Sequence, residues 1–296
     1  MANTRALVQR RKSVRNTRKI TKTMQMVSTA KLAKASAAAI AARPYATKLQ
    51  QVIGDLAKNS ADVQHPLLED HTPAKKAVIV LFTSDRGLCG GYNSNTIKLA
   101  RVLAADIKAR GLEVEWVVQG KKGVGSLRYA GITPVKTYLL VSDKPAFTRA
   151  EEIGDELIRR FTNREIDEAY IVYSMFKSMT TQVPKSEKIL PLSSMAVAVA
   201  GKDGVGKIDG AGGGFIFEPD AMSILSEVLP NVVKMSIFTA MLDSTAGEHA
   251  ARRLAMQNAT DAADDMIKAL SRAYNRARQS KITQEIAEIV GGAEAL

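Results

Sequence analysis

The longest regular pattern of apolar and polar positions covers residues 221–290. Its apolar residues recur at steps of three and four, a spacing that places one apolar stripe along a helix. Two runs form this stripe, namely Val228, Val232, Met235, Phe238 and Leu242, and then Ile267, Leu270, Tyr274 and Ala277. An unbroken helix over this stretch would be about 100 Å long at about 1.5 Å per residue. Such a long stripe needs a partner helix, in this chain or in another protein.

The start of this helix carries two further signals. Asp220 stands where an N-cap is expected, because its side chain can accept a hydrogen bond from the first turn. Pro230 lacks the N–H group that an interior helical position donates. Pro230 therefore leaves two alternatives open, a helix that kinks at the proline and a helix that breaks into two segments.

Residues 4–57 form a second helical pattern, interrupted only by Pro44 and Gly54. Apolar residues recur at helical spacing, and alanines between them would let a second helix approach closely. The apolar residues are Ile20, Met24, Val27, Leu49, Ile53 and Leu56, and the alanines are Ala30, Ala33, Ala37 and Ala41. We expect the two ends of the chain to pair as a long antiparallel α-helical coiled coil, with the middle folded beside it. The alternative is two ordinary core helices of a bundle.

Between these helices, short apolar runs alternate with helical patterns, which predicts a Rossmann-like α/β domain with a mainly parallel sheet. Expected strands lie near 77–82, 113–118, 133–139, 168–176 and 188–192, and expected helices near 94–110, 122–130 and 148–162. The expected organisation is an N-terminal coiled-coil helix (1–60), a linker (61–76), the α/β domain (77–200), a glycine-rich loop (201–218) and the C-terminal coiled-coil helix (219–296).

Positive charge is concentrated in the N-terminal helix. Residues 1–60 hold 13 Lys and Arg and a single acid, Asp55, so they carry the whole net charge of +12. Such an arm could bind nucleic acid, act as a mitochondrial presequence or face an acidic protein surface. Tyr45 is its one aromatic residue, which argues against base stacking, and its helical pattern continues past any plausible presequence cleavage point.

No catalytic or metal-binding pattern stands out. Cys89 is the only cysteine and the three histidines are scattered, so we expect no internal disulfide, no metal and no cofactor. The turn S-D-R-G-L-C-G-G-Y-N after the first strand fits neither phosphate-loop pattern. A tight structural turn is favoured over a nucleotide site, and a buried thiol over a nucleophile. No run of about 18 uncharged apolar residues is present to cross a membrane.

Three motifs resemble the γ subunits of F-type ATP synthases. The first is R-N-T-R-K-I-T-K-T-M-Q-M-V-S-T-A-K at 15–31, and the second is the glycine-rich turn at 84–93. The third is M-Q-N-A-T-D-A-A-D-D-M-I at 256–267 with Y-N-R-A-R-Q-S-K-I-T-Q-E-I-A-E-I-V at 274–290. The motifs occur in the family's order and are spread over nearly the whole chain.

The resemblance implies a central rotor shaft with no active site of its own. The shaft would stand in the α3β3 ring of F1 and turn with the c-subunit ring of Fo. It would couple proton-driven rotation to conformational cycling of the β catalytic sites for ATP synthesis or hydrolysis. The resemblance also implies an ε-type partner, no nucleic acid, and membrane contact only through the c ring. The expected location is the cytoplasmic face of the bacterial inner membrane, with the mitochondrial matrix face as the alternative.

The same resemblance assigns contact residues. Rotor–stator contacts with the β and α subunits are expected at Met24, Arg253, Arg278, Gln279, Thr283 and Glu285. A foot position near the c ring is matched by Glu218, and the apolar tip of the shaft by Ile286, Ile289 and Val290. The basic arm would face acidic loops of the β subunits through exposed pairs worth about 0–1 kcal/mol each. With Cys89 alone, a thiol switch of the chloroplast type is excluded.

Overall fold

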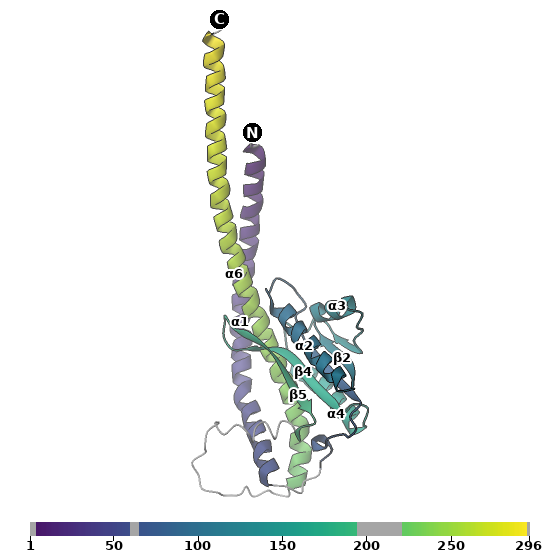
Figure 1. Ribbon diagram of the computed structural model, residues 1–296. Coiled ribbons are helices and arrows are strands. Elements are labelled where there is room, and N and C mark those ends of the chain that lie inside the picture. Colours follow the sequence, from purple (N-terminus) through teal and green to yellow (C-terminus); the bar gives the residue numbers. More distant parts are fainter. Residues whose placement is uncertain (1–3, 60–64, 194–220, 295–296) are drawn as a thin grey trace. The chain divides into compact units, whose positions relative to one another are not determined.

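A computed structural model describes residues 4–59, 65–193 and 221–294 of the chain. The chain divides into two units, Lys31–Ala251 and a second unit that joins Met1–Ala30 to Arg252–Leu296. Two long helices, α1 and α6, contribute to both units (Figure 1). The elements are α1 (Thr4–Asn59), the 3-10 turn η1 (Pro66–Leu68), β1 (Lys76–Phe82), α2 (Tyr92–Ala109), β2 (Glu113–Gln119), α3 (Lys121–Tyr129), β3 (Lys136–Tyr138), α4 (Phe147–Thr162), β4 (Glu168–Phe176), β5 (Gln182–Leu190) and α6 (Ala221–Glu294).

The unit Lys31–Ala251 contains a five-stranded sheet in the order β3-β2-β1-β4-β5. β1 pairs in parallel with β2 and β4, and β2 pairs in parallel with β3, whereas β5 runs antiparallel to β4. Continuous apolar runs place β1 and β4 at the centre, where both faces of a strand are buried. The predicted Rossmann-like, mainly parallel domain is confirmed. β5 begins earlier than predicted because its first residues, Q-V-P-K-S-E-K, carry little apolar signal.

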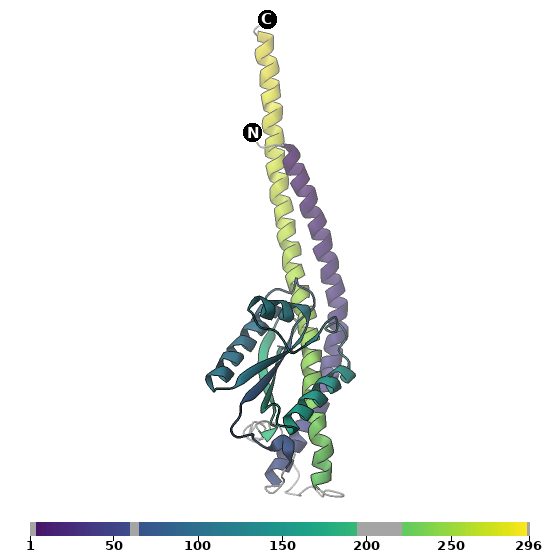
Figure 2. The same cartoon turned by 90° about the vertical axis from the view of Figure 1, so that its right-hand side faces the viewer.

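Helices cover both faces of this sheet, as Figures 1 and 2 show. On one face α2 and α3 pack around Ile79, Leu81 and Val172. On the other face α4 and the first part of α6 pack against Val80 and Phe82. The first part of the C-terminal helix therefore contributes side chains to the hydrophobic core of the α/β domain.

Within the same unit, α1 packs antiparallel against α6 in a small apolar cluster. The members are Leu32, Ala39, Phe176, Leu242, Ala246 and Ala250. The alanine row predicted for this contact, Ala30, Ala33, Ala37 and Ala41, is exposed instead. That prediction was wrong because alanines occupy several faces of α1 in this region, so their spacing does not single out one face.

In the unit that joins Met1–Ala30 to Arg252–Leu296, α1 and α6 also pair antiparallel. Arg18 Nε lies 2.5 Å from Asp264 Oδ1. Further along α1, the Thr260 hydroxyl donates a hydrogen bond of 2.8 Å to the Thr21 hydroxyl. The partner numbers fall on α6 as they rise on α1, which is the arrangement predicted for the coiled coil.

The face of α1 that pairs with α6 here differs from the predicted one. Ile20 and Val27 are 61% and 52% exposed, whereas Thr21 and Ser28 are buried. Small hydroxyl residues form this seam because they allow close helix approach and their hydroxyls bond within it, as Thr21 does to the Arg18 carbonyl oxygen. An apolar count therefore selected the wrong face of α1 in this unit, although it placed the α6 stripe correctly and, in the other unit, Leu49 packs against the core as predicted.

α6 continues through Pro230, so the alternative of two separate segments is wrong. α1 likewise continues through Pro44. Asp220 and the glycine-rich loop at 201–218 lie outside the described residues.

Candidate functional site

The C-terminal end of α6 presents an exposed apolar row. Ile286, Ile289 and Val290 are 56%, 73% and 52% exposed. They recur at helical spacing, so they share one face of the helix. Apolar side chains that cluster in water mark a surface for another protein. The tip predicted from the sequence is thus exposed in the chain by itself.

The polar residues assigned to partner contacts lie just before this tip. Arg278, Gln279, Thr283 and Glu285 are all exposed. Lys281 Nζ lies 3.3 Å from Glu285 Oε1, one helical turn away. An exposed pair of this kind is weak and can exchange partners. These side chains are therefore available to form and release contacts.

Two further assigned residues lie elsewhere in this unit. Met24 on α1 and Arg253 on α6 are half-buried. Their side chains are therefore only partly accessible to another chain. Glu218, the assigned foot position, lies outside the described residues.

The glycine-rich turn between β1 and α2 forms a closed structural turn. The Asp85 carboxylate accepts hydrogen bonds from the Lys121 backbone N–H at 3.1 Å and from the Ser142 hydroxyl at 3.0 Å. The carboxylate of the turn thus binds the N-terminus of α3, where the helix dipole favours a negative charge. Cys89 is 2% exposed, as expected of a buried thiol. This geometry supports the structural interpretation of the turn.

A run of buried polar residues in the middle of α6 was missed by sequence reasoning. These residues are Asp243, Ser244, Thr245, Glu248 and His249, each 5% exposed or less. Buried polar groups need hydrogen-bond or charge partners. The available signal was the gap between the two apolar runs of α6, where D-S-T-A-G-E-H-A interrupts the stripe. We call this run, together with its partners, the polar junction; the partners are Lys31, Arg43, Tyr92, Ser142, Asp143 and Phe176.

Hydrogen bonds join α6 to two parts of the α/β domain. The Tyr92 hydroxyl on α2 donates to the Ser244 carbonyl oxygen at 2.8 Å. The Thr245 hydroxyl lies 2.8 Å from the Ser142 carbonyl oxygen, in the segment between β3 and α4, and 2.9 Å from the Met241 carbonyl oxygen of its own helix, so its one proton is shared between the two acceptors. Gly247 allows α6 to approach closely, because a Cβ there would lie 3.3 Å from the Tyr92 ring.

α1 joins the same region through Arg43. Its Nη2 donates to the Phe176 carbonyl oxygen at 2.6 Å and lies 3.3 Å from Asp243 Oδ1. Burial raises the pKa of Asp243, and the charge and hydrogen bond of Arg43 offset only part of that effect. The arginine thus links a helix, a strand end and a buried carboxyl group.

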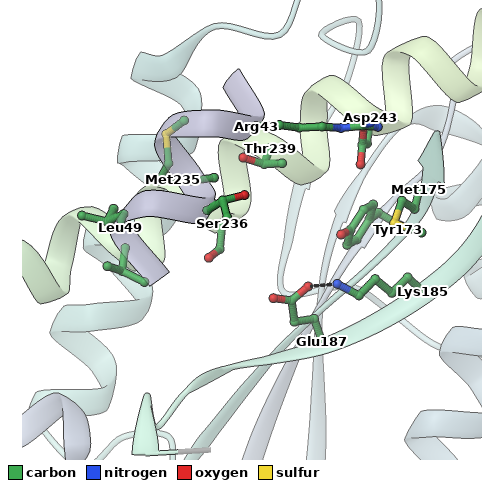
Figure 3. A pocket seen from close by; sticks show the side chains of 13 residues that line it. Arg43, Leu49, Tyr173, Met175, Lys185, Glu187, Met235, Ser236, Thr239 and Asp243 are labelled. Atoms are coloured by element: carbon green, nitrogen blue, oxygen red, sulfur yellow. Dashed lines mark hydrogen bonds and ion pairs between the residues drawn. The ribbon is translucent and has the colours of Figure 1, made fainter. Parts of the chain in front are cut away.

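A polar cavity of about 180 Å³ adjoins the Arg43–Asp243 pair (Figure 3). Lys185 Nζ lies 2.6 Å from Glu187 Oε2 on its wall. Burial raises the pKa of Tyr173, and the carboxylates of Glu187 and Asp243 raise it further. Each cation of the wall faces a carboxylate, so the cavity has no charge preference for a ligand.

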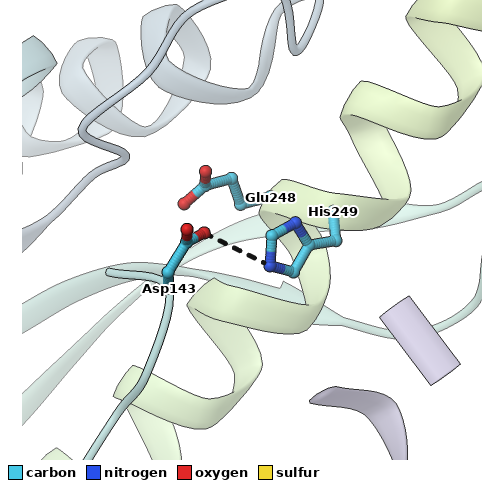
Figure 4. A group of neighbouring side chains, drawn as sticks. All are labelled: Asp143, Glu248 and His249. Carbon is cyan, nitrogen blue, oxygen red and sulfur yellow. Dashed lines mark ion pairs between the residues drawn. The ribbon is translucent and has the colours of Figure 1, made fainter. Parts of the chain in front are cut away.

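Asp143 forms the other charged centre of the junction (Figure 4). Its carboxylate lies 2.7 Å from Lys31 Nζ and 3.6 Å from His249 Nε2. Burial by itself would raise the pKa of Asp143, but the hydrogen bond and charge of Lys31 and the charges of His249 and Arg86 lower it overall. Asp143, Glu248 and His249 offer ligand atoms within 4.8 Å of one another, a spacing compatible with a cation. Lys31 already supplies a positive charge there, so the cluster fits a balanced ion-pair network better than a metal centre.

Among the described residues, no helix combines the length and apolarity needed to cross a bilayer. The fold and the exposed surfaces described above place the chain in a class of proteins that have two paired long helices, an exposed apolar helix end and a Rossmann-like domain joined to both helices. The sequence model of the family described as ATP synthase matches residues 3–296.

Curated relatives give the particular family. The ATP synthase gamma chain of Leptospira biflexa is 39% identical over 296 residues, which is 100% of each chain. The ATP synthase gamma chain of Rhodopirellula baltica is 40% identical over 297 residues and covers 100% of this chain and 99% of that one. The chain therefore belongs to the ATP synthase gamma chain family.

Solved structures with a similar fold come from mitochondrial ATP synthases. The Euglena gracilis OSCP/F1/c-ring structure has a TM-score of 0.63 at 17% identity, covering 99% of this chain and 94% of that chain. The Tetrahymena thermophila central stalk/c-ring structure has a TM-score of 0.59 at 22% identity, covering 81% and 99%. At these identities the likeness concerns the fold.

Proposed function

We propose that this chain is the central rotor shaft of an F1Fo ATP synthase. It couples rotation of a c-subunit ring to conformational cycling of the β catalytic sites, and it has no active site of its own. Membership of the gamma chain family over the full sequence carries this proposal. The likeness to a central stalk and c-ring structure supports a c ring as a partner.

The contacts of the shaft follow from its exposed residues. The apolar tip of Ile286, Ile289 and Val290 would sit in an apolar collar of the α3β3 ring, where burial favours contact without fixing a rotational angle. Arg278 and Gln279 would make polar contacts that form and release as the shaft turns. Met24, Arg253, Thr283 and Glu285 are further contacts with the β and α subunits. Glu218 would lie near the c ring.

The basic arm gives the shaft a long-range attraction to its surroundings. Cations on α1 such as Lys12, Arg15 and Lys19 are exposed. Facing acidic loops of the β subunits, they would attract each loop in turn without a tight pair. An ε-type subunit completes the proposed set of partners, and the chain would contact the membrane only through the c ring. We place the complex at the cytoplasmic face of a bacterial inner membrane, in keeping with bacterial relatives at about 40% identity.

Reconstitution tests this proposal directly. Mg-ATP hydrolysis is measured for the purified chain alone, for the α and β subunits of the same enzyme, and for all three together. The expected result is an inert chain alone and steady turnover of the mixture that depends on adding the chain. Hydrolysis by the chain alone, or no effect of the chain on the α and β subunits, would contradict the proposal.

A further inference from the structure

The α/β domain contacts the two long helices through three separate elements of the polar junction. The first is α2, which bonds α6 through Tyr92. The second is the segment between β3 and α4, which bonds α6 at Thr245 and contacts α1 at Lys31. The third is the end of β4, which accepts a hydrogen bond from Arg43 of α1. Each long helix is therefore held from more than one direction.

These bonds constrain rotation in a way that apolar packing does not. A hydrogen bond weakens steeply as its angle departs from linear, whereas apolar burial depends mainly on area. The Tyr92 and Thr245 bonds end one residue apart on α6, so they contact it at different angles around its axis. A turn of α6 against the domain would strain both bonds. Gly247 keeps the helix close enough for these short bonds, since a side chain there would press on Tyr92.

We propose that the polar junction is a torsional clamp, which fixes the rotational position of α6 and α1 against the α/β domain. Torque that enters the domain then reaches the long helices with little elastic loss. The clamp rests on the proposed function as a rotor shaft, and it assigns to Tyr92, Thr245, Arg43 and Asp143 a positioning role in coupling. These residues act through the helices and make no contact with a nucleotide.

A paired set of substitutions separates a clamp from ordinary stability. Tyr92→Phe with Thr245→Val removes two hydroxyls that cross the junction and leaves the shapes nearly unchanged. Tyr170→Phe with Thr96→Val is the matched control, because these hydroxyls bond inside the α/β domain, to Glu168 at 2.8 Å and to the Tyr92 carbonyl oxygen at 2.9 Å. Each pair removes one phenol hydroxyl and one threonine hydroxyl from buried sites.

The measurement is the torsional stiffness of the assembled complex of this chain with α and β subunits. Lys108→Cys places a label on the exposed surface of α2, while the native Cys89 is 2% exposed and reacts slowly. With the ring fixed to a surface, the label reports the angular spread of the α/β domain during each pause between ATP-driven steps. We expect the junction pair to raise the angular variance at least about twofold. The control pair should leave the angular variance unchanged. Neither pair should change the unloaded stepping rate.

Equal variance in the junction and control pairs would overturn the clamp. If the junction pair does not assemble, Tyr92→Phe against Tyr170→Phe gives the same comparison with a smaller expected rise in variance. A different result would contradict the proposed function as a rotor shaft. In that result, the label on the chain that carries only Lys108→Cys would not rotate when ATP is added.

Discussion

The buried carboxyl group of Asp243, paired with the partly exposed Arg43, yields a stability prediction with an unusual sign. Asp243 is 4% exposed, and burial raises the pKa of its carboxyl group despite the nearby guanidinium. A raised pKa means that the folded protein holds the neutral form more tightly than the unfolded chain does. The ionised carboxylate therefore costs folding free energy. Asp243→Asn, which keeps the shape without the charge, should raise the free energy of unfolding by about 1 kcal/mol near pH 8.

The pH dependence of this gain follows from the same shift. Below the unfolded pKa of about 3.9, Asp243 is neutral in both states, so wild type and Asp243→Asn should be equally stable. As pH rises through the folded pKa, wild type loses this contribution and the variant does not. The difference should grow with pH and then level off. Urea denaturation of the purified chain between about pH 4 and pH 8 measures it.

Arg43→Met completes a double-mutant cycle. It removes the hydrogen bond to the Phe176 carbonyl oxygen and leaves Asp243 without its nearest cation. Because Arg43 is 43% exposed, we expect a loss of about 1–2 kcal/mol rather than the full cost of breaking a buried pair. In the Asp243→Asn background the loss should fall to about 1 kcal/mol, the value of the remaining bond. A destabilised Asp243→Asn variant at pH 8, or a difference from wild type that does not change with pH, would refute this reasoning.

Three further predictions concern other sites. Gly120→Ala should lower the free energy of unfolding by more than about 3 kcal/mol in urea denaturation, because Gly120 has a φ of +99° and its added Cβ would lie 2.2 Å from a backbone oxygen. Gly111→Ala is the control, because Gly111 has a similar φ of +88° but open space around it, and its expected cost is about 1 kcal/mol. Arg110→Met should cost about 1 kcal/mol at neutral pH. Burial by itself would raise the pKa of Glu168, but hydrogen bonds led by Arg110 lower it overall. The stability cost of Arg110→Met should therefore shrink as pH falls through the pKa of Glu168 in the folded protein. A stability cost that stays constant in a pH series would contradict this prediction. Met24→Lys should lower the ratio of proton pumping to ATP hydrolysis in the reconstituted complex, and a normal ratio would remove Met24 from the contact set.

Much of the fold could be predicted from spacing because the strongest patterns are also the most buried. The continuous apolar run of β1 indicates a strand buried on both faces, and the stripe around Leu270 indicates a helix with one buried face. The family assignment was confirmed by relatives over the whole chain. The contact residues carried over from the resemblance remain predictions, because they concern surfaces that only partner chains cover.

The failures have a physical cause on α1. Apolar side chains such as Ile20 and Val27 are exposed, while Thr21 and Ser28 form the seam with α6. Apolar residues occur on more than one face of α1, so hydrophobic periodicity does not identify the face that packs against α6. The hydrogen bond between Thr21 and Thr260 joins residues far apart in sequence, and no local pattern encodes it.

The buried polar residues of α6 escaped prediction for a related reason. An aspartate, a glutamate and a histidine within seven residues normally indicate a solvated helix face. Here each is 4% exposed or less, because α1 and the α/β domain enclose the helix and supply the charges that burial requires. In a rotor shaft, contacts with the stator must release at every step, which suits exposed residues and weak pairs. Contacts inside the rotor must hold against the same torque, and short bonds from several directions meet that requirement.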